Sequence, residues 1–256
     1  MTLSLAGEPL LAYLLASVRI FTWLMIAPPF AGRTVPTQLK AVLAVALAMA
    51  VAPITGGATI PDTTLGLLLE IVGQVFIGGL MGFVTMMLFS AVAAAGSIID
   101  LFGGFAISAA FDPLNMTMNT IMGKFHAMLA MALLIVSGGH LLIIGGLLKT
   151  FAVLPVGEAI SVPTGAEVLT TAFGVFFVTA VQIALPLVAV LFVADLGLAL
   201  LTKIAPHLNA INVMFPAKIG LTLLVVGMSF PVLPGVIDRL VELILQAMST
   251  LAGGGG

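Results

Sequence analysis

Long apolar runs recur along this chain, and they constrain its fold more than any other feature. Six such stretches cover most of the sequence: Leu10–Pro29, Ala41–Pro53, Leu65–Ile99, Phe125–Leu148, Val168–Ala194 and Ile219–Val236. Apolar runs of about 18 residues or more are typical of membrane-spanning helices. Of the 256 residues, 61% are hydrophobic and only 7% are charged, whereas soluble domains are roughly one quarter charged. The sequence therefore predicts an all-α integral membrane protein.

Charge and cysteine content exclude several classes of function. Eight Lys and Arg residues against ten Asp and Glu residues give a net charge of −2, which lacks the basic footprint of a nucleic-acid-binding protein. The chain has no cysteine, so thiol chemistry is absent. Its three histidines are far apart, and no zinc-protease, phosphate-loop, dinucleotide or serine-hydrolase motif occurs. We therefore expect no enzyme activity, no metal site and no cofactor.

The apolar stretches differ widely in length. Ala41–Pro53 has 13 residues and would reach about 20 Å as a helix, whereas Leu65–Ile99 has 35 and would reach about 52 Å. A hydrocarbon core is ~30 Å thick, so the first appears too short to span it and the second too long. The pattern favours kinked helical hairpins of uneven length. We expect one integral membrane domain over residues 1–252 and a flexible glycine tail at 253–256.

Polar residues at apparent membrane depth are the first candidates for function. Arg19 lies near the middle of the first stretch, where a cation costs about 2.5–3.5 kcal/mol. It is expected to pair with an acidic residue or, alternatively, to reach an interface with its long side chain. Glu70 and Gln74 share one helix face because they are four residues apart. Asp100 ends the third stretch.

Two further sets of residues leave alternatives open. Asp195, Lys203 and Lys218 make the region before the sixth stretch polar, which indicates either buried subunit contacts or a simple cytoplasmic loop with positive charges. Gly78 and Gly82 form a small-xxx-small pair that permits close helix approach. This pair fits packing inside the monomer as well as a contact between subunits.

The segment GGFAISAAFDPLNMTMNT, which ends at Thr120, is the least regular part of the chain. Its apolar and methionine residues suit a loop that lies inside the protein and seals a conduit, because methionine repacks easily; the alternative is an exposed loop between helices. The residues expected to form this plug are Phe105, Ala106, Ile107, Phe111, Asp112, Pro113, Leu114, Asn115, Met116, Met118 and Met122.

Four parts of the chain resemble one known family. They are Arg19–Pro53, Glu70–Asp100, the FDP turn at Phe111–Pro113, and Asp195–Val225, within which the run from Ala205 to Lys218 is the most specific. All four look like the FliR family of flagellar export-gate proteins, whose relatives in virulence systems are called SctT. The resemblance covers nearly the whole chain in order.

The resemblance implies a non-enzymatic channel subunit of the flagellar type III export gate, which helps form and close the conduit for unfolded substrates. It further implies a multi-pass location in the bacterial inner membrane at the flagellar basal body. The partners would be FliP and FliQ, with FlhA and FlhB nearby, and the plug would be Phe105 to Thr120. A competing reading is a secondary transporter whose solute site uses Arg19 and Glu70, although no repeat between the halves is visible.

Overall fold

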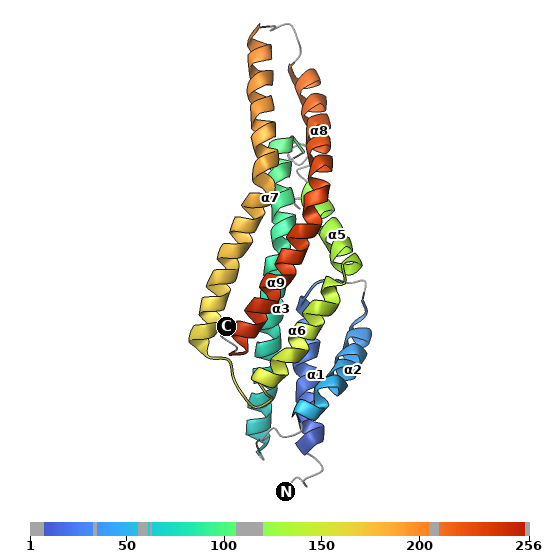
Figure 1. Ribbon diagram of the computed structural model, residues 1–256, viewed down its shortest axis with the longest axis vertical. Coiled ribbons are helices and arrows are strands. Elements are labelled where there is room, and N and C mark those ends of the chain that lie inside the picture. The colour runs from blue at the N-terminus through green and yellow to red at the C-terminus, as the bar shows by residue number, and fades with distance from the viewer. Residues whose placement is uncertain are drawn as a thin grey trace. The chain divides into compact units, whose positions relative to one another are not determined.

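A computed structural model describes residues 8–32, 35–55, 61, 63–105, 120–204 and 210–253. Every regular element in these ranges is a helix, which confirms the all-α prediction (Figure 1). The elements are α1 (Glu8–Ile26), α2 (Thr37–Thr55), α3 (Thr64–Gly103), α5 (Ile121–Val136), α6 (Gly139–Val153), α7 (Val162–Ile204), α8 (Ala210–Ser229), the short 3-10 helix η1 (Phe230–Val232) and α9 (Leu233–Leu251).

The helix lengths are as uneven as expected, with one correction. Helix α2 has 19 residues and reaches about 28 Å, so the prediction that this stretch is too short to span was wrong. The apolar run underestimated the helix because polar Thr37 and Lys40 extend it at one end and it continues through Pro53 at the other. Helices α3 and α7 have 40 and 43 residues, or about 60 and 65 Å.

The fourth apolar stretch is a broken helix. Helix α5 ends at Val136 and α6 begins at Gly139. Gly138, between them, has a φ of 74°, which a side chain would disfavour. Five helices are long and apolar enough to cross a membrane, or six if α5 and α6 together form one span, among the residues that the structure describes.

The chain folds into two compact units, and the division falls inside helices. The first unit comprises residues 1–88, 135–174 and 238–256, and the second comprises residues 89–134 and 175–237. Helices α3 and α7 therefore each contribute to both units. That residues 1–252 form one membrane domain stays a prediction.

In the first unit, α1 packs against both α2 and the first half of α3. Tyr13 on α1 donates a hydrogen bond from its hydroxyl to the backbone oxygen of Val45 on α2, at 2.7 Å. The fully buried indole of Trp23 donates to Oγ1 of Thr85 on α3, at 3.4 Å. Gly78 and Gly82 lie on the face of α3 that meets α1. Small residues at these positions therefore allow the two backbones to approach closely.

The second unit has its own apolar core, to which four helices contribute. Its buried members come from α3, α5, α7 and α8: Ala95, Ile99, Met122, Ala184, Leu187 and Val226. Phe105 packs against the same cluster from just beyond the end of α3. This core holds the end of α3 and the start of α5 together, on either side of the predicted plug.

Candidate functional site

Arg19 is a fully buried cation, and each of its three guanidinium nitrogens has a hydrogen-bond partner in the first unit. Its Nε donates to Oε1 of Gln74 at 2.7 Å, and its Nη1 donates to the backbone oxygen of Leu154 at 2.9 Å. Nη2 reaches the backbone oxygen of Pro155 at 3.4 Å. The guanidinium carbon lies 4.2 Å from the ring centroid of Phe151, which adds a cation–π attraction. Arg19 thus satisfies carbonyl groups that the end of α6 leaves without helical partners.

Glu70 completes this cluster through Gln74. The side-chain amide of Gln74 donates to Oε1 of Glu70 at 2.7 Å, and the backbone N–H of Gly157 donates to the same oxygen at 2.9 Å. Gly157 has a φ of 99°, a conformation that favours glycine. A line of hydrogen bonds therefore runs from Arg19 through Gln74 to Glu70 and fixes the connection between α6 and α7.

Asp100 caps the start of α5 in the second unit. Its oxygens Oδ1 and Oδ2 accept from the backbone N–H of Met122 at 3.0 and 2.9 Å, and Oδ2 also accepts from Gly123 at 3.2 Å. Free N–H groups and a partial positive charge at a helix start favour a carboxylate there. Ser97 and Thr120 add a hydroxyl contact of 3.0 Å alongside. The carboxylate of Asp100 is buried, so this cap is shielded from water.

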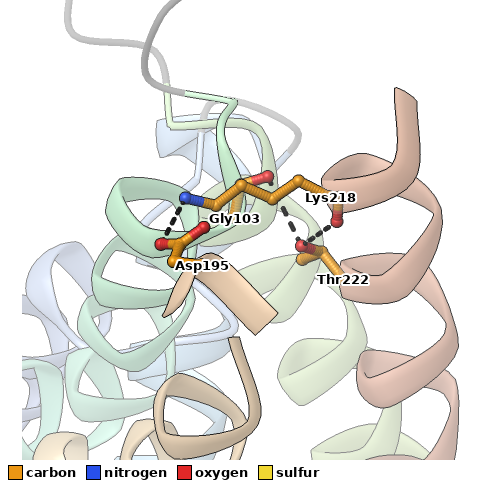
Figure 2. Close-up of polar contacts among 4 residues, drawn as sticks. All are labelled: Gly103, Asp195, Lys218 and Thr222. Carbon is orange, nitrogen blue, oxygen red and sulfur yellow. Dashed lines mark hydrogen bonds and ion pairs between the residues drawn. The ribbon is translucent and has the colours of Figure 1, made fainter. Parts of the chain in front are cut away.

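A second polar contact ties α7 to α8 and α8 to the end of α3 (Figure 2). Nζ of Lys218 lies 2.8 Å from Oδ2 of Asp195, and both side chains are partly exposed. The buried hydroxyl of Thr222 points toward the backbone oxygens of Gly103, at 3.4 Å, and Lys218, at 2.8 Å. The hydroxyl has one proton, so the shorter contact is the stronger bond.

These contacts anchor both ends of the segment in which the plug is expected. Thr222 lies against Gly103 on one side, and Asp100 holds Met122 on the other. Met122 is buried, and Phe105 is partly buried. The other residues expected in the plug lie outside the described residues: Ala106, Ile107, Phe111, Asp112, Pro113, Leu114, Asn115, Met116 and Met118.

The remaining candidate residues are placed as follows. Gly78 faces the backbone of Arg19, and Gly82 faces Trp23 and Ile26, all on α1 of the same chain. Lys203, expected as a buried charge or a subunit contact, is exposed within this chain in the last turn of α7, so a subunit contact at Lys203 stays a prediction. A cation in that position is stabilised by the helix dipole and needs no buried partner.

Some residues of these clusters could not be identified from the sequence. The carbonyls of Leu154 and Pro155 have none, because any residue offers a backbone oxygen. Phe151 is one of 16 phenylalanines, and nothing in its neighbourhood marks it as the partner of a cation. His126 is fully buried, with Nδ1 2.8 Å from the oxygen of Met122, and its Nε2 has no hydrogen-bond partner within the described part of the chain.

The described residues include no group of three or more His, Cys, Asp or Glu side chains that could hold a metal ion. Within each polar cluster, the side chains are instead bonded to one another or to backbone groups. The role of these clusters is therefore structural, because they fix helix ends, connections and close helix contacts.

Comparisons with known proteins give a consistent result. Residues 10–244 match the family model described as bacterial export proteins, family 1. The flagellar biosynthetic protein FliR of Escherichia coli is 31% identical over 174 residues, which is 68% of this chain and 67% of that protein. The protein of the same name from Aquifex aeolicus is 29% identical over 71% of this chain and 70% of its own. That from Bacillus subtilis is 27% identical over 70% of this chain and 71% of its own.

Proposed function

Because this chain belongs to the bacterial export protein family 1, we propose that it is a non-enzymatic channel subunit of the flagellar type III protein export gate. It is a component of the flagellar export apparatus and a multi-pass protein of the bacterial inner membrane. In the gate it helps to form and to close the conduit through which unfolded export substrates pass.

The family match carries this proposal. It extends from residue 10 to residue 244, and so covers the helices from α1 to most of α9. The relatives that support it are all named as flagellar proteins, which favours a flagellar over a virulence system.

The exposed surfaces of the long helices support a hetero-oligomeric assembly with FliP and FliQ, with FlhA and FlhB nearby. Large apolar side chains are exposed along α3: Leu65, Leu69, Val72, Phe76, Phe83 and Leu101. They span positions 65 to 101, or about 54 Å of helix, whereas hydrocarbon covers only ~30 Å. Lipid cannot cover that whole length. Protein partners are therefore proposed to cover the remainder.

The plug remains part of the proposal. We expect residues 105–120 to hold the closed conduit against ion leakage, with support from the sequence of this segment and its resemblance to the FliR family. The bonds at Asp100 and Thr222 suit this role because they fix where the segment begins and ends. Deleting residues 110–115 should raise the ion permeability of the closed gate while assembly persists. Unchanged permeability in a fully assembled gate would refute the plug.

The hydrogen bonds of Arg19 and Glu70 argue against the transporter alternative. A solute site needs polar groups that are free to bind the solute. Arg19 and Glu70, which that alternative would use, are instead joined through Gln74 and bonded to backbone groups at residues 154, 155 and 157.

Co-expression with the neighbouring export genes tests the proposal. We expect the chain to purify with FliP and FliQ in one complex of defined mass, and its loss to abolish motility, which the wild-type gene restores. The Lys149→Gln variant serves as a matched control, because Lys149 is exposed and belongs to none of the candidate sites, and this variant should still assemble. A chain that purifies only as a monomer, or that is dispensable for motility, would contradict the proposal.

A further inference from the structure

Helix α9 has one apolar and one polar side, which distinguishes it from the helices of the other candidate membrane spans. One face is apolar and almost completely buried: Ile237, Leu240, Val241, Ile244, Met248 and Leu251. The other face is polar and exposed: Asp238, Arg239, Glu242, Gln246 and Thr250. The spacing of three and four residues within each set is that of a helix with two distinct sides.

The apolar face of α9 already has a protein partner in the first unit. Leu245 and Met248 lie against Gly146 on α6, where a Cβ atom would be 3.9 Å from the sulfur of Met248. Val241 and Ile244 are at most 3% exposed. The side of α9 that is not packed against the rest of the chain is therefore the polar one.

That polar side fits water better than lipid. Asp238, Arg239 and Glu242 bring three charges into five residues, while the whole 256-residue chain has 18. None of the three forms an ion pair with another described residue. Charged side chains that face hydrocarbon are rare because they lose hydration without gaining a partner.

The same side chains fit water better than a protein partner. The buried centre of a protein interface is depleted of charged residues and enriched in aromatic ones. The polar face of α9 has the opposite composition: its charges have mixed sign with a sum of −1, and its other exposed members, Gln246 and Thr250, are an amide and a hydroxyl.

We propose that the polar face of α9 borders water in the assembled protein, so that α9 stands at a hydrated surface and is not a lipid-facing part of a membrane span. By length and composition, residues 216–251 count as one candidate span of 36 residues. If the polar face of α9 borders water, only the α8 part of this candidate span lies in hydrocarbon, and α9 lies outside it. This placement of α9 goes beyond the proposed function, because an export-gate subunit does not by itself require α9 to face water.

Cysteine accessibility tests this directly, because the chain contains no cysteine. Gln246→Cys and Thr250→Cys place single thiols on the polar face of α9. Ile244→Cys places one on its buried face, and Met49→Cys places one on the apolar surface of α2, where Met49 is 67% exposed. Each variant is made in the full chain and co-expressed with the neighbouring export genes. A small, charged, membrane-impermeant maleimide is then applied to spheroplasts and to inverted membrane vesicles.

We expect Gln246→Cys and Thr250→Cys to react in the purified complex and in one of the two membrane preparations. Their rates should be at least about tenfold above that of Met49→Cys, since the reactive thiolate forms poorly in apolar surroundings. Ile244→Cys should react only after denaturation. A maleimide that carries a large polymer distinguishes two locations of a water-exposed thiol. It reaches a thiol that faces an open aqueous compartment, but it is excluded from a thiol that faces an enclosed conduit.

Two results would overturn the inference. In one, both polar-face thiols stay unreactive until denaturation, which would place them in lipid or in a packed interior. In the other, they react in the isolated chain but are protected in the complex, which would place them against a partner. Motility and co-purification are measured on the same variants. Their retention shows that the chain folds and assembles, so a failure of this inference is distinct from a failure of the proposed function.

Discussion

Replacing Gly78 with alanine should separate α1 from α3. A Cβ atom at Gly78 would overlap the backbone oxygen of Arg19, and would lie 3.1 Å from its carbonyl carbon and 3.2 Å from its Cα. These are backbone atoms, so no side-chain rotation relieves the overlap. Gly73, five residues earlier on α3, offers a matched control because a Cβ atom there meets nothing within 4 Å.

The expected magnitude follows from two opposing effects. Alanine in place of a helical glycine stabilises the helix by about 1 kcal/mol, which is the whole effect expected at Gly73. Forced overpacking costs about 1–3 kcal/mol, and the rigid backbone at Arg19 places Gly78 at the upper end of that range. The free energy of unfolding should thus differ by about 2–3 kcal/mol between Gly78→Ala and Gly73→Ala, with Gly78→Ala the less stable.

Thermal unfolding of the purified chain in one detergent measures this difference. For a chain of this size, 1 kcal/mol corresponds to about 2–4 °C in Tm, so Tm should be roughly 4–12 °C lower for Gly78→Ala than for Gly73→Ala. Equal Tm values for the two variants, or a Gly78→Ala chain more stable than the wild type, would show that the close contact between α1 and α3 does not exist.

The polar contacts described above give three further predictions. Arg19→Met should lower the free energy of unfolding by about 2–4 kcal/mol, because the buried side-chain oxygen of Gln74 and the backbone oxygen of Leu154 each lose a donor. Denaturant titration measures this loss, and a loss below 1 kcal/mol would count against the cluster. Asp100→Ala should lower the free energy of unfolding by about 2–4 kcal/mol, because it leaves two backbone amides of α5 without acceptors. Ser97→Ala should lower it by under about 1 kcal/mol. Similar losses in the two variants would argue against the cap. Lys218→Met, which removes the Asp195–Lys218 pair, should lower the free energy of unfolding by about 1 kcal/mol or less, since partly exposed pairs contribute little. Added salt should leave the stability of this variant unchanged. A loss above 3 kcal/mol would contradict this expectation.

The sequence predicted the helical class well because that prediction depends only on apolar content. Helix boundaries were harder to predict. At α2, the run of apolar residues begins after the helix does, since Lys40 is already helical while its Nζ contacts the backbone oxygen of Gly32 at 3.5 Å. The break at Gly138 lay inside an apolar stretch, where hydropathy carries no information about backbone direction.

The candidate site was predictable in part. The sequence indicated that Arg19 needs a partner and that Glu70 and Gln74 share one helix face, but it did not show that Gln74 would accept from Arg19. The backbone acceptors at Leu154 and Pro155 could not have been predicted, because they depend on how α6 ends in three dimensions. Asp100 was recognised as unusual, but its role as a cap arises from a helix that starts 21 residues later and is not adjacent in the sequence.

The first unit contains both the first and the last residues to be translated, so it is completed only at the end of synthesis. Residues 1–88 leave the ribosome first, yet this unit also needs residues 135–174 and the part of α9 from residue 238 onward. The apolar side of α6 that receives Leu245 therefore stays uncovered while residues 175–237 of the second unit are being made. Until α9 is translated and docks, the nascent chain presents a binding surface for insertion factors or chaperones, and a chain cut before residue 238 should remain bound to them.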